Sequence, residues 1–194
     1  MGGIVLTPVG RRLDSGKFVL VAHDFARAYD TIDHKLLYAK ILSRLPKCMA
    51  NWIYHLLRDR RACAEVNGVR SRERPFRAGL PQGSVLAPTL YTLWAADLVE
   101  ELREVLWSSV FVCADEDDTA TLSTGATIQQ ALARTQLLAD AMVRWANRNK
   151  MSISGPKTQL LILSQWASDA KDASIRVGGV EVRGSPHLKL LLFL

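Results

Sequence analysis

Apolar residues along this chain alternate between short continuous runs and longer stretches at helical spacing. The run from Phe18 to Ala22 is apolar at every position, which is typical of a strand buried on both faces. Similar runs predict further strands at 110–114, 119–122, 160–163, 175–182 and 188–194. The pair Gly178-Gly179 predicts a turn that divides the run at 175–182 into two strands.

Amphipathic helices are predicted between these strands, where apolar residues recur every three or four positions. The helical stretches cover residues 33–45, 50–58, 88–106 and 128–149. Asp33 is a suitable cap for the first of them, and Pro46 is expected to end it. The resulting order of elements predicts an α+β sandwich in which helices pack on a sheet.

A β-hairpin is predicted at residues 62–70, because Asn67-Gly68 between β-forming residues is a strong signal for a two-residue turn. This hairpin lies in a basic stretch with seven arginines between Arg58 and Arg77 and three acids. A solvated surface would explain such a run of charge. The planar guanidinium also suits phosphate, so a nucleic-acid surface is the second interpretation.

Composition is that of an ordinary globular protein. The 194 residues are 48% hydrophobic and 23% charged, and the formal net charge of +6 permits binding to a polyanion. No apolar run approaches the roughly 18 residues of a membrane span, and the N-terminus lacks a signal-peptide pattern, so we expect an intracellular protein. The three cysteines lack metal-type spacing and are expected to be reduced thiols.

Four consecutive acids, Asp115 to Asp118, lie between two predicted strands. Such a turn is often only a solvated loop, but crowded carboxylates favour a cation. Asp24 ends another apolar strand, and in an antiparallel sheet its carboxylate could meet the acidic turn. Carboxylate oxygens suit Mg²⁺ or Mn²⁺, and two such ions about 3.5 to 4 Å apart catalyse phosphoryl transfer in polymerases and nucleases.

Five segments in order resemble the motifs of reverse transcriptases encoded by non-LTR retrotransposons. Residues 21–34 (VAHDFARAYDTIDH) are similar to motif A, and residues 78–88 (AGLPQGSVLAP) are similar to motif B, which is the most specific match. Residues 113–120, 155–158 and 188–191 resemble motifs C, D and E. The resemblance implies a polymerase palm, an antiparallel sheet packed on helices, over residues 17–194, with residues 1–16 as a short extension.

The resemblance also implies an activity and its participants. The chain would be an RNA-directed DNA polymerase that uses two Mg²⁺ or Mn²⁺ ions, deoxynucleoside triphosphates, an RNA template and a DNA primer. No membrane would take part, and the location would be nuclear.

Site residues follow from the matching positions. The implied metal ligands are Asp24, Asp115 and Asp118, and the implied catalytic residues are Asp24, Asp117, Asp118 and Lys157. The implied substrate-binding residues are Phe25, Tyr29, Gln82 and Gly83, with Tyr29 as the aromatic gate that excludes a 2′-hydroxyl. The implied nucleic-acid contacts are Arg58, Arg60, Arg61, Arg70, Arg72 and Arg74.

Two departures from the family pattern weaken the expected activity. The usual Ala-Asp-Asp core of motif C is two residues longer here, so that either Asp115 or the pair Asp117-Asp118 matches the metal ligands. We also expect the fingers and thumb of the family to be truncated, because only 23 residues precede Asp24 and no thumb-like segment follows residues 188–191. We therefore expect a truncated palm that is weakly active or inactive; the alternatives are a non-catalytic relic that binds nucleic acid and an unstable fragment.

Overall fold

The computed structural model describes residues 16–105, 110–115, 118–164 and 168–185, without the side chains of 110–118 and 171. Two compact units make up the chain. The sheet unit comprises Met1–Ala26, Asp97–Arg148 and Ser152–Leu194, and the helical unit comprises Arg27–Ala96 and Asn149–Met151. The predicted strand at 188–194 and nearly all of the extension at 1–16 lie outside the described residues.

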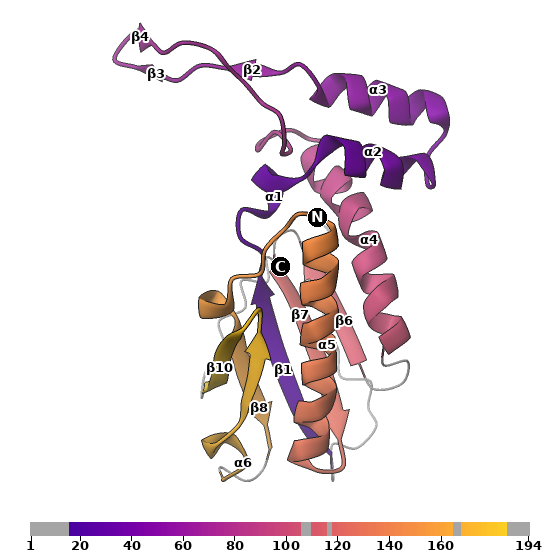
Figure 1. Ribbon diagram of the computed structural model, residues 1–194, viewed down its shortest axis with the longest axis vertical. Coiled ribbons are helices and arrows are strands. Elements are labelled where there is room, and N and C mark those ends of the chain that lie inside the picture. The colour runs from indigo at the N-terminus through magenta and orange to yellow at the C-terminus, as the bar shows by residue number, and fades with distance from the viewer. Residues whose placement is uncertain (1–15, 106–109, 116–117, 165–167, 186–194) are drawn as a thin grey trace. The chain divides into compact units, whose positions relative to one another are not determined.

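A six-stranded sheet forms the centre of the sheet unit (Figure 1). Its strands, in spatial order, are β6 (Val110–Asp115), β7 (Asp118–Gly125), β1 (Lys17–Asp24), β8 (Gln159–Leu163), β10 (Val180–Ser185) and β9 (Ser174–Val177). Neighbouring strands are antiparallel except β8 and β10, which are parallel. That pair departs from the all-antiparallel prediction because helix α6 (Ser168–Lys171) and β9 intervene, so that β10 enters the sheet in the direction of β8.

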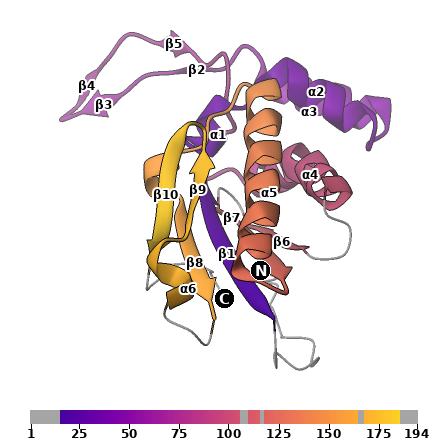
Figure 2. The same cartoon turned by 60° about the horizontal axis from the view of Figure 1, so that its bottom comes forward.

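Helix α5 (Ile128–Arg148) packs along one face of this sheet, as Figure 2 shows. Val19 and Val21 of β1 are fully buried in one core cluster with Ala131 and Ala139 of α5. Positions 18, 20 and 22, on the opposite face of β1, are only half-buried. The prediction that β1 is buried on both faces was therefore wrong, because α5 covers one face.

The second half of helix α4 (Ala87–Val105) is tied to α5 by polar contacts within the sheet unit. Nε1 of Trp145 donates to Oδ1 of Asp97 at 3.0 Å, and Arg148 forms an ion pair with Glu101. These contacts fix one helix against the other at two points one turn apart.

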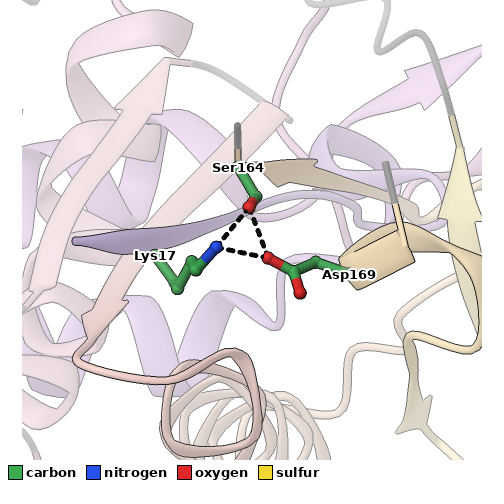
Figure 3. A network of polar contacts seen from close by, with 3 residues as sticks. All are labelled: Lys17, Ser164 and Asp169. Carbon is green, nitrogen blue, oxygen red and sulfur yellow. Dashed lines mark hydrogen bonds and ion pairs between the residues drawn. The ribbon is translucent and has the colours of Figure 1, made fainter. Parts of the chain in front are cut away.

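The start of β1 is held by the network of Figure 3. Nζ of Lys17 donates to Oγ of Ser164 at 2.7 Å and lies 2.6 Å from Oδ2 of Asp169, which also accepts from Ser164. The Lys17 ammonium, followed by the Ser164 hydroxyl, lowers the pKa of Asp169 below its usual value. The network joins β1, the residue after β8, and α6.

Helices α1 (Ala28–Thr31), α2 (His34–Leu42) and α3 (Lys47–Leu57) lie in the helical unit. Asp33 caps α2 as predicted, since its Oδ1 accepts from the backbone N–H groups of Lys35 and Leu36. Helix α2 ends at Leu42, before the predicted stop, and Pro46 instead is the N-cap of α3, which begins at Lys47, three residues earlier than predicted. Among the helices of the described part, none is long and apolar enough to cross a membrane.

The predicted hairpin at Asn67-Gly68 is confirmed. Strands β3 (Glu65–Val66) and β4 (Val69–Arg70) flank the turn, whose residues have φ of 51° and 79°, as a type I′ turn requires. Nearer the helices, β2 (Arg61–Ala62) pairs with β5 (Arg74–Pro75) in a register that is shifted by one residue. The returning strand therefore contains a bulge, which twists the ribbon. Every residue from 61 to 77 is exposed; we call residues 58–77 the arginine ribbon.

Candidate active site

Three acids occupy one row across adjacent strands of the sheet unit. Asp24, the last residue of β1, is directly opposite Asp118 in β7, and Asp118 is opposite Asp115 in β6. Opposed Cα atoms in an antiparallel pair are about 4.5 to 5.5 Å apart. The expected meeting of Asp24 with the acidic segment is therefore present in the backbone register. We call Asp24, Asp118 and Asp115 the acidic row; Asp117 lies outside the described residues.

Asp24 is partly accessible and pairs with a lysine. Its side chain is 23% exposed, and its Oδ2 lies 3.0 Å from Nζ of Lys157. The carbonyl of Asp24 accepts from the backbone N–H of Ser154 at 2.8 Å, and Ser152 accepts from Ala26 at 2.9 Å. The segment before Lys157 is thus fixed to the chain that leaves β1.

Lys157 is the last residue of the short 3₁₀ helix η1 (Gly155–Lys157). A Cβ at Gly155 would lie 2.7 Å from Cβ of Val180, so only glycine lets this turn pack against β10. The backbone N–H groups of Lys157 and Thr158 donate to the carbonyl of Ser154 at 3.1 and 3.0 Å. These bonds fix the backbone of Lys157 independently of its side chain, which is 72% exposed.

His23 precedes Asp24 but is buried on the α5 side of β1. It is 1% exposed, and its Nε2 lies 3.2 Å from Oγ1 of Thr121. Its Nδ1 has no hydrogen-bond partner among the residues that the structure describes. Burial lowers the pKa of His23 from 6.5 to about 3, so the ring is neutral near pH 7.

Phe25 packs into the core of the sheet unit. Its ring is 1% exposed and meets Trp145 edge-on, with centroids 5.7 Å apart. A side-chain contact between Phe25 and a substrate therefore stays a prediction, since the observed contacts of the ring are with the core.

Tyr29, Gln82 and Gly83 belong to the helical unit, where motif A and motif B meet. The ring of Tyr29 stacks on Tyr91, with centroids 5.0 Å apart and planes at 18°. The backbone N–H of Leu80 donates to the carbonyl of Tyr29 at 2.8 Å, and Nε2 of Gln82 donates to Oδ1 of Asp30 at 3.0 Å. Motif B thus holds the short helix that carries Tyr29.

Gly79 allows this close approach. Its φ is +87°, and a Cβ there would lie 2.9 Å from both Cα and the carbonyl oxygen of Asp30. Its carbonyl accepts from Nε2 of His34 at 2.8 Å. Gly83 also has a positive φ, of +82°, but no atom lies within 4 Å of its Cβ position.

Tyr91 and Asp30 were not among the residues that the sequence indicated. Tyr91 belongs to the apolar pattern of α4, and Asp30 is one acid on a short helix. No local signal distinguishes a ring that stacks on Tyr29 from any other buried ring, so only the packed structure identifies these two.

The arginines of the arginine ribbon fall into two groups. Ion pairs join Arg58 to Asp59, Arg61 to Glu73 and Arg70 to Glu65. No ion pair links the others to a described residue; these are Arg60, Arg72, Arg74 and Arg77. The guanidinium of Arg60 lies 6.0 Å from the ring centroid of Phe76.

The described side chains include no group of three His, Cys, Asp or Glu residues arranged to hold a metal ion. Asp24 is among these side chains, whereas only the backbones of Asp115 and Asp118 are described. The acidic row is therefore defined by its register.

Residues 11–182 match the sequence model of the family described as reverse transcriptase (RNA-dependent DNA polymerase). The chain belongs to this family. This reverse transcriptase chain is 32% identical over 136 residues to the RNA-directed DNA polymerase from mobile element jockey of Drosophila melanogaster. It is 29% identical over 142 residues to the probable RNA-directed DNA polymerase from transposon BS of the same fly. These relatives confirm the predicted resemblance to the enzymes of non-LTR elements.

The matches cover 69% and 70% of the reverse transcriptase chain but only 15% of each relative. Among solved structures, apo telomerase from Candida tropicalis, truncated from its C-terminal domain, aligns with a TM-score of 0.60 and 12% identity. That alignment covers 86% of this chain and 34% of the telomerase. The likeness confirms the predicted α+β palm-type fold.

Proposed function

We propose that this chain is the palm of an RNA-directed DNA polymerase and that nucleotidyl transfer takes place at the acidic row. The observation that supports this most strongly is the register that aligns Asp24 with Asp118 and Asp115. Acids from three strands share one row at the end of the sheet. An isolated acidic turn would bring together only acids that are neighbours in sequence.

The residues present fit two Mg²⁺ or Mn²⁺ ions. Carboxylate oxygens are the preferred ligands of these ions, and Asp24 already holds a cation, the ammonium of Lys157. Asp24 would be shared between the ions, with Asp115 or Asp118 as the second ligand and Asp117-Asp118 as the alternative pair. When bound, such ions stabilise the attacking and leaving oxygens of an in-line phosphoryl transfer.

The remaining residues would act on the substrates. Lys157 would present its ammonium to the triphosphate, where positive charge or a donated proton stabilises the leaving group. Tyr29 would lie under the incoming deoxynucleoside triphosphate, and Gln82 and Gly83 would lie near the nascent base pair. The arginine ribbon would hold phosphates of the RNA template and DNA primer.

The longer acidic segment is expected to keep activity low. Two additional residues lengthen the connection between Asp115 and Asp118, whereas catalytic groups must be held within about 0.5 Å. A non-catalytic nucleic-acid-binding protein is the second candidate, favoured by the exposed arginines that no ion pair joins to a described acid.

Primer extension on an RNA template with Mg²⁺ tests the proposal. We expect slow extension by the wild-type chain and a loss of at least about a hundredfold in Asp24→Asn. Asp140→Asn, which alters an exposed acid of α5, is the matched control and should extend as the wild type does. Equal extension by Asp24→Asn and wild type would contradict the proposed site. RNA binding without any extension would favour the second candidate.

A further inference from the structure

The ion pair between Asp24 and Lys157 joins a proposed metal ligand to a proposed catalytic cation. Nζ of Lys157 lies 3.0 Å from Oδ2 of Asp24, and both residues belong to the sheet unit. The same oxygen cannot bind an ammonium and a divalent cation without bringing two positive charges together.

We propose that Lys157 is a built-in counter-ion of Asp24, which must be displaced before Asp24 binds a divalent cation. This inference rests on the proposed function. Binding of the cation and release of the lysine are then one coupled event, so that the ammonium becomes available to a triphosphate only at a loaded site.

The structure makes this exchange easy. The side chain of Lys157 is 72% exposed and has a flexible four-carbon stem, so it can leave Asp24 without disturbing any packing. Exposed ion pairs contribute little to stability, and little is lost when this one breaks. The backbone stays in place because its bonds to Ser154 do not depend on the ion pair.

The position of Lys157 limits how far its ammonium can move from Asp24. Its turn is fixed to the end of β1 through Ser152 and Ser154, so the ammonium can swing but its Cα stays close to Asp24. A lysine released from Asp24 therefore remains beside the acidic row, where the phosphates of a bound nucleotide would lie.

Binding of Mn²⁺ in the absence of nucleotide tests the proposal without any need for activity. The fraction of free Mn²⁺ can be followed by its electron paramagnetic resonance signal in wild type, Lys157→Gln, Lys157→Met and Lys157→Arg. Removal of the competing charge should tighten binding about twofold to fivefold in the Gln and Met variants, the range expected for exposed pairs. Lys157→Arg retains the charge and should bind as the wild type does.

Lys150→Gln is the matched control. Lys150 is 64% exposed and pairs with Asp33 at 2.5 Å, so this variant loses one ammonium and one ion pair of the helical unit. We expect it to leave Mn²⁺ affinity unchanged. The gain in Lys157→Gln should also shrink at high salt, which screens exposed charges.

Each outcome has a defined meaning. Equal affinity in Lys157→Gln, Lys157→Met and wild type, or weaker binding in the two variants, would overturn the counter-ion proposal. An equal gain in Lys150→Gln would also overturn it, because net charge alone would then explain the effect. Asp24→Asn separates the two proposals. If this variant retains full Mn²⁺ affinity, the proposed metal site itself is wrong. If the variant loses Mn²⁺ affinity, the metal site stands and only the role of Lys157 depends on the other variants.

Discussion

His23 is the residue whose ionisation differs most clearly between the folded and unfolded chain. Its pKa is about 3 in the fold and near 6.5 when exposed, because burial disfavours the imidazolium. The unfolded chain therefore binds a proton more readily than the folded chain does between these two values. Stability contributed by neutral His23 is fully present above pH 6.5 and is lost as the pH falls toward 3.

Replacement of His23 by Gln should remove this dependence, since Gln can still bond to Thr121 but does not titrate. Urea unfolding between pH 7 and 4 should give a flatter dependence of the free energy of unfolding in His23→Gln than in wild type. His55→Gln, which alters an exposed histidine of α3, should follow the wild type. Parallel curves for wild type and His23→Gln would mean that other groups cause the acid sensitivity.

Gly79 and Gly83 differ in how closely other atoms approach the position of a Cβ atom. Both have positive φ, but only Gly79 meets backbone atoms at the Cβ position. Gly83→Ala should cost about 1 kcal/mol, the strain of a left-handed alanine, whereas Gly79→Ala should cost at least about 2 kcal/mol because Asp30 must also move. Chemical denaturation of both variants measures the difference, and equal losses would show that the contact with Asp30 is easily relieved.

Local chemistry explains which residues the sequence could identify. Asp33 and Asn67-Gly68 act through their own neighbours in sequence, so a cap and a turn could be predicted from a few positions. The contacts of Tyr91 with Tyr29 and of Asp30 with Gln82 join residues that are 62 and 52 positions apart, which no short pattern encodes.

The arginine ribbon is expected to determine how strongly RNA binding depends on salt. Arg72→Gln combined with Arg74→Gln removes two cations that no ion pair joins to a described residue, so the slope of log K against log salt should fall by about 1.4 on single-stranded RNA. The matched pair, Arg61→Gln with Arg70→Gln, removes arginines that are already paired with Glu73 and Glu65 and should change the slope less.

Fluorescence anisotropy of a labelled RNA over a range of salt concentrations measures both slopes. Equal reductions in the two double variants would show that the ion pairs do not restrain Arg61 and Arg70. No change in either variant would place the RNA on another surface.

The connection between β6 and β7 contains two residues more than the family pattern. Deletion of Glu116 and Asp117 restores the family-like order Ala114-Asp115-Asp118. Since the loss of one electrostatic stabiliser commonly costs about a hundred- to a thousandfold, we expect the deletion to raise the rate of primer extension at least about tenfold. A lower rate than that of the wild type would mean that the longer segment is needed.

The positions of strands and helices in the sequence were predicted more successfully than the packing and relative direction of these elements. Periodicity located β1 and α5, but it could not show that α5 covers only one face of β1 or that β8 and β10 are parallel. Those features depend on the order in which strands enter the sheet. A run of apolar residues predicts a strand but does not indicate which elements pack beside it.

The two units of the molecule do not follow the order of the sequence, because one unit is made of stretches that lie far apart along the chain. The sheet unit combines three separate stretches of chain, and the helical unit is formed largely by residues 27–96 between the first two. The family motifs predicted one palm over residues 17–194 and did not indicate this division. Periodicity alone predicted helices on a sheet, without the division into units.

The central position of β1 has a consequence for synthesis. Its partner β7 follows nearly 100 residues later and its other partner β8 about 140 residues later, so at about 5 to 20 residues per second a ribosome needs roughly 7 to 30 s to supply both. Throughout that interval the nascent chain carries an apolar strand with an open hydrogen-bonding side. β1, which ends in Asp24, leaves the ribosome well before both of its partners, so chaperone protection of this strand is most valuable while residues 25–163 are being made.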